Sequence, residues 1–267
     1  MKTITFFYLC CFVTLFAQTS SAQTYYYDNT QSIEGDDYEV SFDNAVSKND
    51  YCKMATKVTN NSLDFIMIET KETVYKNGTV EQNHPKKKTF IVSPGKKKSY
   101  TMVFDGNGGY DYNVQNFSID FGGLYLIPSD GEKVKAPKFN LPASDNEIEA
   151  GDFVIKLKKL KKETKETIAT FEVMYKGREI GLVHPSNLVA VFTGRGGAGY
   201  ANDNKNAASE VLERGDKCTV KAVFHISAKD GDMQFVPMQI IWKDTFQTTK
   251  KEKLDRATID FQLGRKK

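Results

Sequence analysis

The chain has 267 residues, of which 40% are hydrophobic, 12% aromatic and 27% charged, and 37 Lys and Arg against 34 Asp and Glu give a net charge of +3. This composition excludes a wholly disordered chain and, with only four cysteines, a disulfide-dense scaffold. The small net charge argues against a basic field over the whole molecule, so no nucleic-acid partner is expected. Because domains usually have about 100–150 residues, the length predicts two domains.

The first 22 residues have the features of a secretory signal peptide. Lys2 gives a positive start, a short apolar run follows, and Ser20 and Ala22 place small residues before the expected cleavage point. A membrane anchor needs about 20 apolar residues, which is more than this run offers. A lipoprotein is the lesser alternative, because the residues before Cys10 lack the small side chains of a lipid-attachment site. The sequence therefore predicts an exported protein with no transmembrane segment in the mature chain. The protein is expected in the periplasm, outside the cell or on the cell surface.

Two cysteines, Cys52 and Cys218, remain after cleavage. An exported protein can keep a disulfide, but these two lie in different halves of the chain, so isolated buried thiols are favoured over one interdomain bridge. The three histidines are widely separated and show no zinc-ligand spacing. No metal site and no cofactor are therefore predicted.

Short stretches of alternating apolar and polar residues recur along the mature chain, separated by clusters rich in Gly, Asn, Asp and Pro. Such alternation is typical of half-buried β-strands, and such clusters are typical of turns. The clearest strands are residues 38–42, 100–104, 153–157, 171–175 and 259–263. Short strands between frequent turns predict an all-β sandwich or barrel. Helical periodicity is weak except over residues 206–214, where a short helix is an alternative to a loop.

The chain also resembles itself. Residues 38–62 match residues 153–177 without a gap at an offset of 115, pairing Tyr38 with Phe153 among other apolar positions. A turn and strand at residues 93–104 recur at residues 213–224. Two copies of one unit, each of about 110 residues, are therefore expected.

The end of the repeat is harder to place. Residues 118–121 resemble residues 258–261, although residues 235–242 compete for the same role. Two prolines and several polar residues favour a linker at residues 135–145. The expected division is a signal peptide at 1–22, a first β-sandwich domain at 23–134, the linker, and a second β-sandwich domain at 146–267.

The duplicated order of an opening strand pair, a turn glycine before a strand that ends in Phe, and a closing strand resembles the tandem immunoglobulin-like β-sandwich modules of exported bacterial proteins, of the Bacteroidetes type. The resemblance implies an all-β fold of two tandem immunoglobulin-like β-sandwich domains after a cleaved signal peptide. The chain lacks the Cys, Trp and Cys arrangement of true immunoglobulin domains, and its one tryptophan is Trp242. The likeness carries over no functional residues.

Lysine clusters are the main basic features. Residues 23–145 carry 14 Lys, no Arg and 17 acidic residues, whereas residues 146–267 carry 22 basic and 17 acidic residues. Strand lysines commonly protect exposed sheet edges, and they can also meet an anionic polysaccharide, a lipid headgroup or an acidic protein. The clusters expected on the surface are Lys86, Lys87, Lys88, Lys96, Lys97 and Lys98.

Two further groups are candidate binding residues. Tyr110, Tyr112 and Tyr125 offer aromatic rings for a carbohydrate platform, although core packing is the alternative for each. Arg195 and Tyr200 are the only contact groups of a glycine-rich stretch that lacks the strand and helix context of a phosphate loop. The oxygen-rich turn at residues 105–113 lacks the spacing of a calcium loop, so structural calcium stays a minor alternative.

No catalytic template fits the sequence. There is no Gly-x-Ser-x-Gly motif, and neither mature cysteine has a local partner signature. The expected function is therefore that of an exported, non-enzymatic interaction protein whose β-sandwich surfaces bind a protein or cell-envelope component. A carbohydrate-binding accessory module is the alternative. A third class, an enzyme whose site is assembled from distant loops, would place His184, Arg195 or Asp203 around a pocket between the halves.

Overall fold

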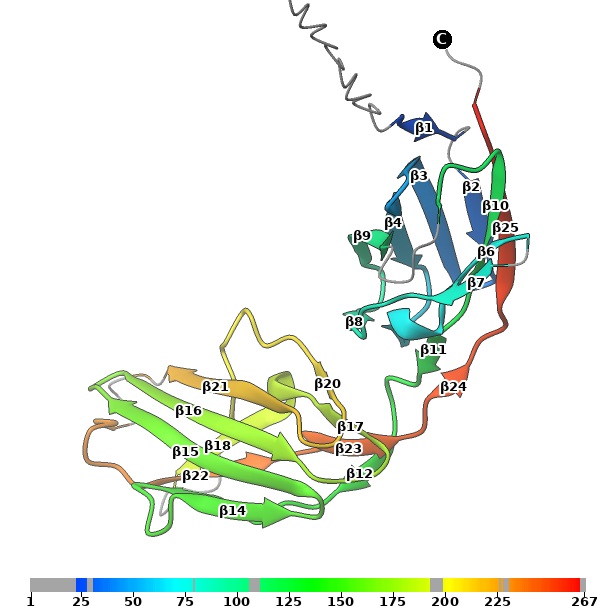
Figure 1. Ribbon diagram of the computed structural model, residues 1–267. Coiled ribbons are helices and arrows are strands. Elements are labelled where there is room, and N and C mark those ends of the chain that lie inside the picture. Colours follow the sequence, from blue (N-terminus) through cyan, green and yellow to red (C-terminus); the bar gives the residue numbers. More distant parts are fainter. Residues whose placement is uncertain are drawn as a thin grey trace, which may run out of the picture.

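The computed structural model describes residues 23–27, 31–78, 80–105, 111–192, 199–225, 227 and 231–264, and it is built almost entirely of antiparallel strands (Figure 1). The prediction of an all-β fold is confirmed. The strands form two lobes, here named domain 1 and domain 2 (Figure 1). Two crossing segments, residues 128–131 and residues 250–251, join the lobes. Within the described residues, no helix has the length and apolar character needed to span a membrane.

The first sheet of domain 1 holds five strands, with β3 and β4 at its centre. Its strands are β1 (Tyr25–Tyr26), β2 (Gln31–Glu34), β3 (Tyr38–Lys48), β4 (Tyr51–Asn60) and β9 (Lys97–Asp105). The second layer consists of four chain segments, each broken by a bend into two strands. These pairs are β5 (Phe65–Glu69) with β6 (Val74–Asn77), β7 (Val80–Asn83) with β8 (Thr89–Val92), β10 (Asn116–Phe121) with β11 (Leu124–Ile127), and β24 (Glu252–Lys253) with β25 (Ala257–Gln262).

Domain 2 repeats this plan. Its first sheet holds β14 (Glu147–Ala150), β15 (Phe153–Lys162), β16 (Glu166–Tyr175) and β21 (Lys217–His225). Its second layer again consists of four bent segments. These are β12 (Glu132–Val134) with β13 (Phe139–Leu141), β17 (Ile180–Val183) with β18 (Leu188–Phe192), β19 (Gly199–Ala201) with β20 (Glu210–Leu212), and β22 (Met238–Trp242) with β23 (Phe246–Thr249).

The bends have local causes. Single turns of 3-10 helix, η1 (Thr70–Glu72) and η2 (Pro185–Asn187), interrupt the equivalent segments of the two domains. Gly123 lies at the bend between β10 and β11 with φ +80°, and a Cβ there would collide with the carbonyl oxygen of Glu69. Only glycine permits both this conformation and this close approach.

The alternative of a helix at residues 206–214 is wrong. The segment is a turn followed by strand β20. The side-chain oxygen of Asn204 accepts a hydrogen bond from the backbone N–H of Asn206 at 3.2 Å, and its carbonyl accepts one from Ala207 at 3.0 Å. Such local bonds give the backbone an alternative to a helix.

The edge strand of each bent layer comes from the other repeat. Strands β12 and β13, which follow domain 1 along the chain, pair with β23 and β22 of domain 2. Strands β24 and β25, which follow domain 2, pair with β11 and β10 of domain 1. The two repeats therefore exchange their last strands, and both crossing segments run between the lobes in Figure 1.

This exchange differs from the expected linear division into domains. Part of the expected linker forms β13, and the end of the expected second domain forms β24 and β25 of domain 1. Residues 118–121 and 258–261, which resemble each other, are neighbours in one sheet, with Ile119 opposite Ile259. The two stretches are alike because both contribute apolar side chains to the core of domain 1. The strand of domain 2 that is equivalent to β10 is β22.

Three apolar clusters hold the molecule together. One fills domain 1 and one fills domain 2, each between its two layers. The third joins the domains: Phe65 and Met67 of β5 pack with Ile180 and Leu182 of β17 and with Ile127 of β11. Because β5 and β17 are covered on both faces, they read as continuous apolar runs rather than as alternating strands.

Candidate functional site

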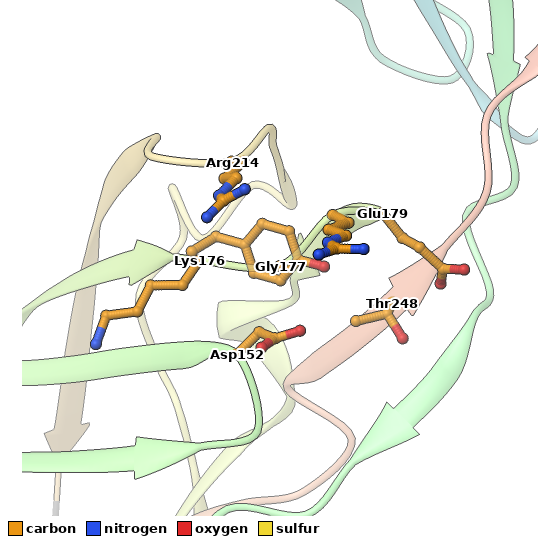
Figure 2. A pocket seen from close by; sticks show the side chains of 8 residues that line it. Asp152, Lys176, Gly177, Glu179, Arg214 and Thr248 are labelled. Carbon is orange, nitrogen blue, oxygen red and sulfur yellow. The ribbon is translucent and has the colours of Figure 1, made fainter.

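A polar pocket of about 370 Å³ lies at the end of domain 2 where β16 finishes (Figure 2). Three turns and the two strands β16 and β23 contribute its walls. The lining residues are Asp152, Tyr175, Lys176, Gly177, Arg178, Glu179, Arg214 and Thr248. Arg214 lies on the opposite side of the opening from Asp152 in Figure 2.

The backbone around Tyr175 fixes these turns. The Tyr175 N–H donates to the carbonyl oxygen of Asp216 at 3.1 Å, and the Tyr175 carbonyl accepts from Gly215 at 2.8 Å. The N–H of Lys176 donates to the carbonyl oxygen of Asp152 at 2.8 Å. The last residues of β16 therefore set the positions of the turns that carry Asp152 and Arg214.

Two glycines make room for the Tyr175 ring, which is fully buried. A Cβ at Gly177 would collide with the Tyr175 hydroxyl, and one at Gly181 would lie 2.8 Å from the ring. Burial raises the pKa of Tyr175, and the nearby Asp152 carboxylate raises it further. The hydroxyl therefore stays protonated at the floor of the pocket.

The charged side chains of the pocket divide into paired and unpaired groups. Lys176 forms an ion pair with Glu149 at 3.4 Å, and Glu179 forms one with Lys250 at 3.6 Å. Within the described part of the chain, the guanidinium groups of Arg178 and Arg214 have no ion pair or hydrogen bond. A guanidinium is a planar donor that matches a carboxylate or phosphate in a two-bond contact. These two arginines are therefore the groups of this pocket that are free to bind an anion.

The predicted tyrosine platform is not assembled among the described residues, and Tyr110 lies outside them. Tyr112 is fully buried in domain 1, where its hydroxyl donates to Gln82. Tyr125 lies at the junction of the domains, its hydroxyl donating to Glu72 and its ring 4.5 Å from the Lys251 ammonium. A buried ring and a ring engaged by its neighbours offer no shared face to a sugar.

Of the predicted pair of Arg195 and Tyr200, the structure describes only Tyr200, because Arg195 lies outside the described residues. Tyr200 belongs to β19 and packs on the domain 2 core, with its ring centroid 5.2 Å from that of Phe192. This contact gives Tyr200 a packing role.

The lysine clusters lie on one edge strand and in the turns beside two edge strands. β8 and β9 are edge strands of their sheets. Lys97 and Lys98 are exposed on β9. Lys86 and Lys88 line a smaller cavity of about 230 Å³ together with Tyr100 and other residues. Lys87 and Lys96 are exposed in the turns beside β8 and β9.

The remaining candidates fall into separate local groups. His184 contacts the Ser209 hydroxyl at 2.8 Å, whereas Asp203 contacts His225 at 2.7 Å. Cys52 is buried in domain 1 and Cys218 is half-buried in domain 2, and both are free thiols. Over the ranges that the structure describes, no three His, Cys, Asp or Glu side chains are grouped to hold a metal ion.

Sequence reasoning missed Arg178 and Arg214, and the internal repeat is the signal that identifies them. At the offset of 115, Arg178 corresponds to Leu63, which is 87% exposed in domain 1. Arg214 precedes Gly215 in the turn that corresponds to Pro94 and Gly95. The scaffold alone therefore does not require arginine at either position. No protein-family model matches the chain, and no curated protein matches it.

Proposed function

We propose that the protein is an exported, non-enzymatic binding protein that holds a carboxylate-bearing segment of a partner protein in the pocket at the end of domain 2. Export rests on the signal-like first 22 residues of the sequence. The binding site is proposed because Arg178 and Arg214 line this pocket without an ion-pair partner among the described residues. The turns around them are held by backbone hydrogen bonds of Tyr175 and Lys176.

The charges around the pocket favour a carboxylate. The two neighbouring carboxylates, Glu179 and Asp152, would repel a doubly charged phosphate group in the pocket more strongly than a singly charged carboxylate, and Glu179 is already paired with Lys250. A single carboxylate can take two parallel hydrogen bonds from one guanidinium. The protonated Tyr175 hydroxyl adds a group that can donate a hydrogen bond at the floor.

A protein partner is favoured over a carbohydrate because of where the aromatic rings lie. Sugar recognition uses exposed aromatic faces, and Tyr112 and Tyr125 are held in internal contacts. An open, polar pocket on loops at one end of a β-sandwich suits an extended acidic segment.

Binding of a labelled hexaglutamate peptide, followed by fluorescence anisotropy, tests this function. Hexaglutamate should bind more tightly than hexaglutamine, and R178A/R214A should weaken hexaglutamate binding at least tenfold, because bonds to charged groups contribute about 1.5–3 kcal/mol each. The matched control K97A/K98A removes the same charge from β9 and should change affinity less than twofold. Equal losses in both double variants, or equal binding of the two peptides, would overturn the proposal.

The conservative variant R178K/R214K separates charge from geometry. Lysine keeps the positive charge but lacks the planar two-bond donor. Affinity should fall several-fold and remain above that of R178A/R214A. Full retention of affinity would show attraction by charge alone and would contradict specific carboxylate recognition in this pocket.

A further inference from the structure

The exchange of last strands makes the two repeats mutually dependent. Each repeat supplies the edge strand of the other domain's bent layer, so neither repeat alone contains a complete sandwich. The arrangement is that of a strand-exchanged dimer whose two subunits are joined in one chain. The segment that joins them is residues 142–146, between β13 and β14.

The interface between the repeats is extensive and apolar. Phe261 of β25 is fully buried in domain 1, where its ring stacks on Phe117 at 4.7 Å between centroids. Ile259 of the same strand is also buried there. On the other side of the exchange, Phe139 of β13 is buried in domain 2 and packs edge-on to Phe171 at 5.1 Å.

Ion pairs of Lys251, Lys253 and Arg256 add to this interface. Lys253 binds Glu72, and Arg256 binds Asp120 with 2.9 Å between Nε and the carboxylate. Lys251 binds Glu69 of domain 1 and also lies 3.6 Å from Glu213 of domain 2. Apart from the Lys251–Glu213 contact, which lies within residues 147–264, these apolar and charged contacts form between residues 23–141 and residues 147–264. None of them involves the joining segment.

We infer that a second copy of this chain can supply the complementary repeat, giving a closed dimer in which residues 23–141 of each chain pair with residues 147–264 of the other. The contacts between residues 23–141 and residues 147–264 are kept. Only the path of residues 142–146 changes, together with the packing of Ala143 on the domain 2 core. Exchange of identical elements is a low-cost route to a dimer, because the new contacts repeat those of the single chain. At low concentration the joining segment favours pairing within one chain, since it holds the two repeats at a high effective concentration.

The length of the joining segment tests this inference. Deleting residues 143–145 removes about 10 Å of reach from the connection between β13 and β14. The deletion variant should therefore form dimers of twice the chain mass, measured by size exclusion with light scattering. The matched control inserts three Gly-Ser pairs at the same place and should be monomeric at the same concentration.

Folding is monitored separately from mass. Trp242 is the only tryptophan and is buried in the domain 2 core, so its fluorescence reports whether that domain has formed. A deletion variant that is folded by this signal and monomeric would overturn the inference. If the deletion variant does not fold, the wild-type chain decides: refolding at rising protein concentration should give a rising dimer fraction, and a monomer at every concentration would overturn the inference.

Discussion

Asn60 in domain 1 and Tyr175 in domain 2 hold the same place in the two repeats, 115 residues apart. Asn60 ends β4 and donates its backbone N–H to the carbonyl of Lys96 at 2.9 Å, just as Tyr175 ends β16 and donates to the carbonyl of Asp216. The next residue in each repeat also makes the same backbone bond, from Asn61 to Asp37 and from Lys176 to Asp152. The backbone hydrogen bonds at this place are therefore the same in both repeats, whereas the side chain is asparagine in domain 1 and tyrosine in domain 2.

The Asn60 side chain closes this end of domain 1. Its amide donates to the carbonyls of Asp64 at 2.7 Å and Val92 at 2.9 Å, and its oxygen accepts from the N–H of Ser62 at 2.9 Å. Asn60→Ala should lower the free energy of unfolding by about 2–4 kcal/mol, because buried backbone groups lose their partners. Urea denaturation followed by circular dichroism measures the loss. The exposed neighbour variant Asn61→Ala should lose less than about 0.5 kcal/mol, and equal effects of the two would contradict this role.

At the corresponding end of domain 2, Gly177 leaves room for the side chains of Tyr175 and Asp152. Gly177→Ala should lower the free energy of unfolding by about 1–3 kcal/mol, because its Cβ collides with the Tyr175 hydroxyl and with Asp152. Combining it with Tyr175→Leu should cost less than the sum of the two single variants, since leucine lacks both colliding atoms of Tyr175, the hydroxyl and the ring carbon Cζ. Thermal unfolding monitored by Trp242 fluorescence measures both effects. Strict additivity of the two substitutions would contradict the collision.

Local sequence patterns predicted the strands but not their partners. Alternation located β3, β15 and β16 correctly, because every second residue of the predicted stretches is a large apolar side chain that packs on a core. The similarity between residues 118–121 and 258–261 suggested equivalent strands, but they are adjacent strands that line one core. A pattern of apolar residues reports which face is buried, and it carries no information on which domain buries it.

Sequence motifs did not locate the candidate site, for a related reason. Asp152, Arg178 and Arg214 come from three turns far apart in the chain, and no motif joins them. Tyr112, in contrast, is a candidate binding residue of the sequence that lies buried, because a sandwich of this size needs large core side chains.

His225 should make the free energy of unfolding depend on pH. The Asp203 carboxylate at Nδ1, 2.7 Å away, and then the Glu166 carboxylate at Nε2, 2.9 Å away, raise the pKa of His225. A group whose pKa is raised by folding stabilises the fold below its unfolded pKa, about 6.5, and loses this contribution as pH rises through the folded value. The melting temperature of the wild type should therefore exceed that of His225→Gln by more at pH 5.5 than at pH 8.5. An equal difference at both values would contradict the ion pairs.

Phe261 tests whether the C-terminal strand completes domain 1. Its ring lies between Phe117 and Phe42, and Phe261→Ala should cost about 3–5 kcal/mol in a core of this kind. Burial raises the pKa of the Cys52 thiol, which reacts only when domain 1 opens, so Phe261→Ala should speed labelling of Cys52 at least tenfold.

Cys218 provides the matching signal for domain 2, since it lies on β21 next to that core. Its labelling rate should change much less than that of Cys52 when Phe261 is truncated. The control Gln262→Ala alters the neighbouring exposed position of the same strand and should leave both rates unchanged. Unchanged Cys52 labelling in Phe261→Ala would mean that domain 1 holds its core without β25, and an equal acceleration at both cysteines would mean that the two domains open as one unit.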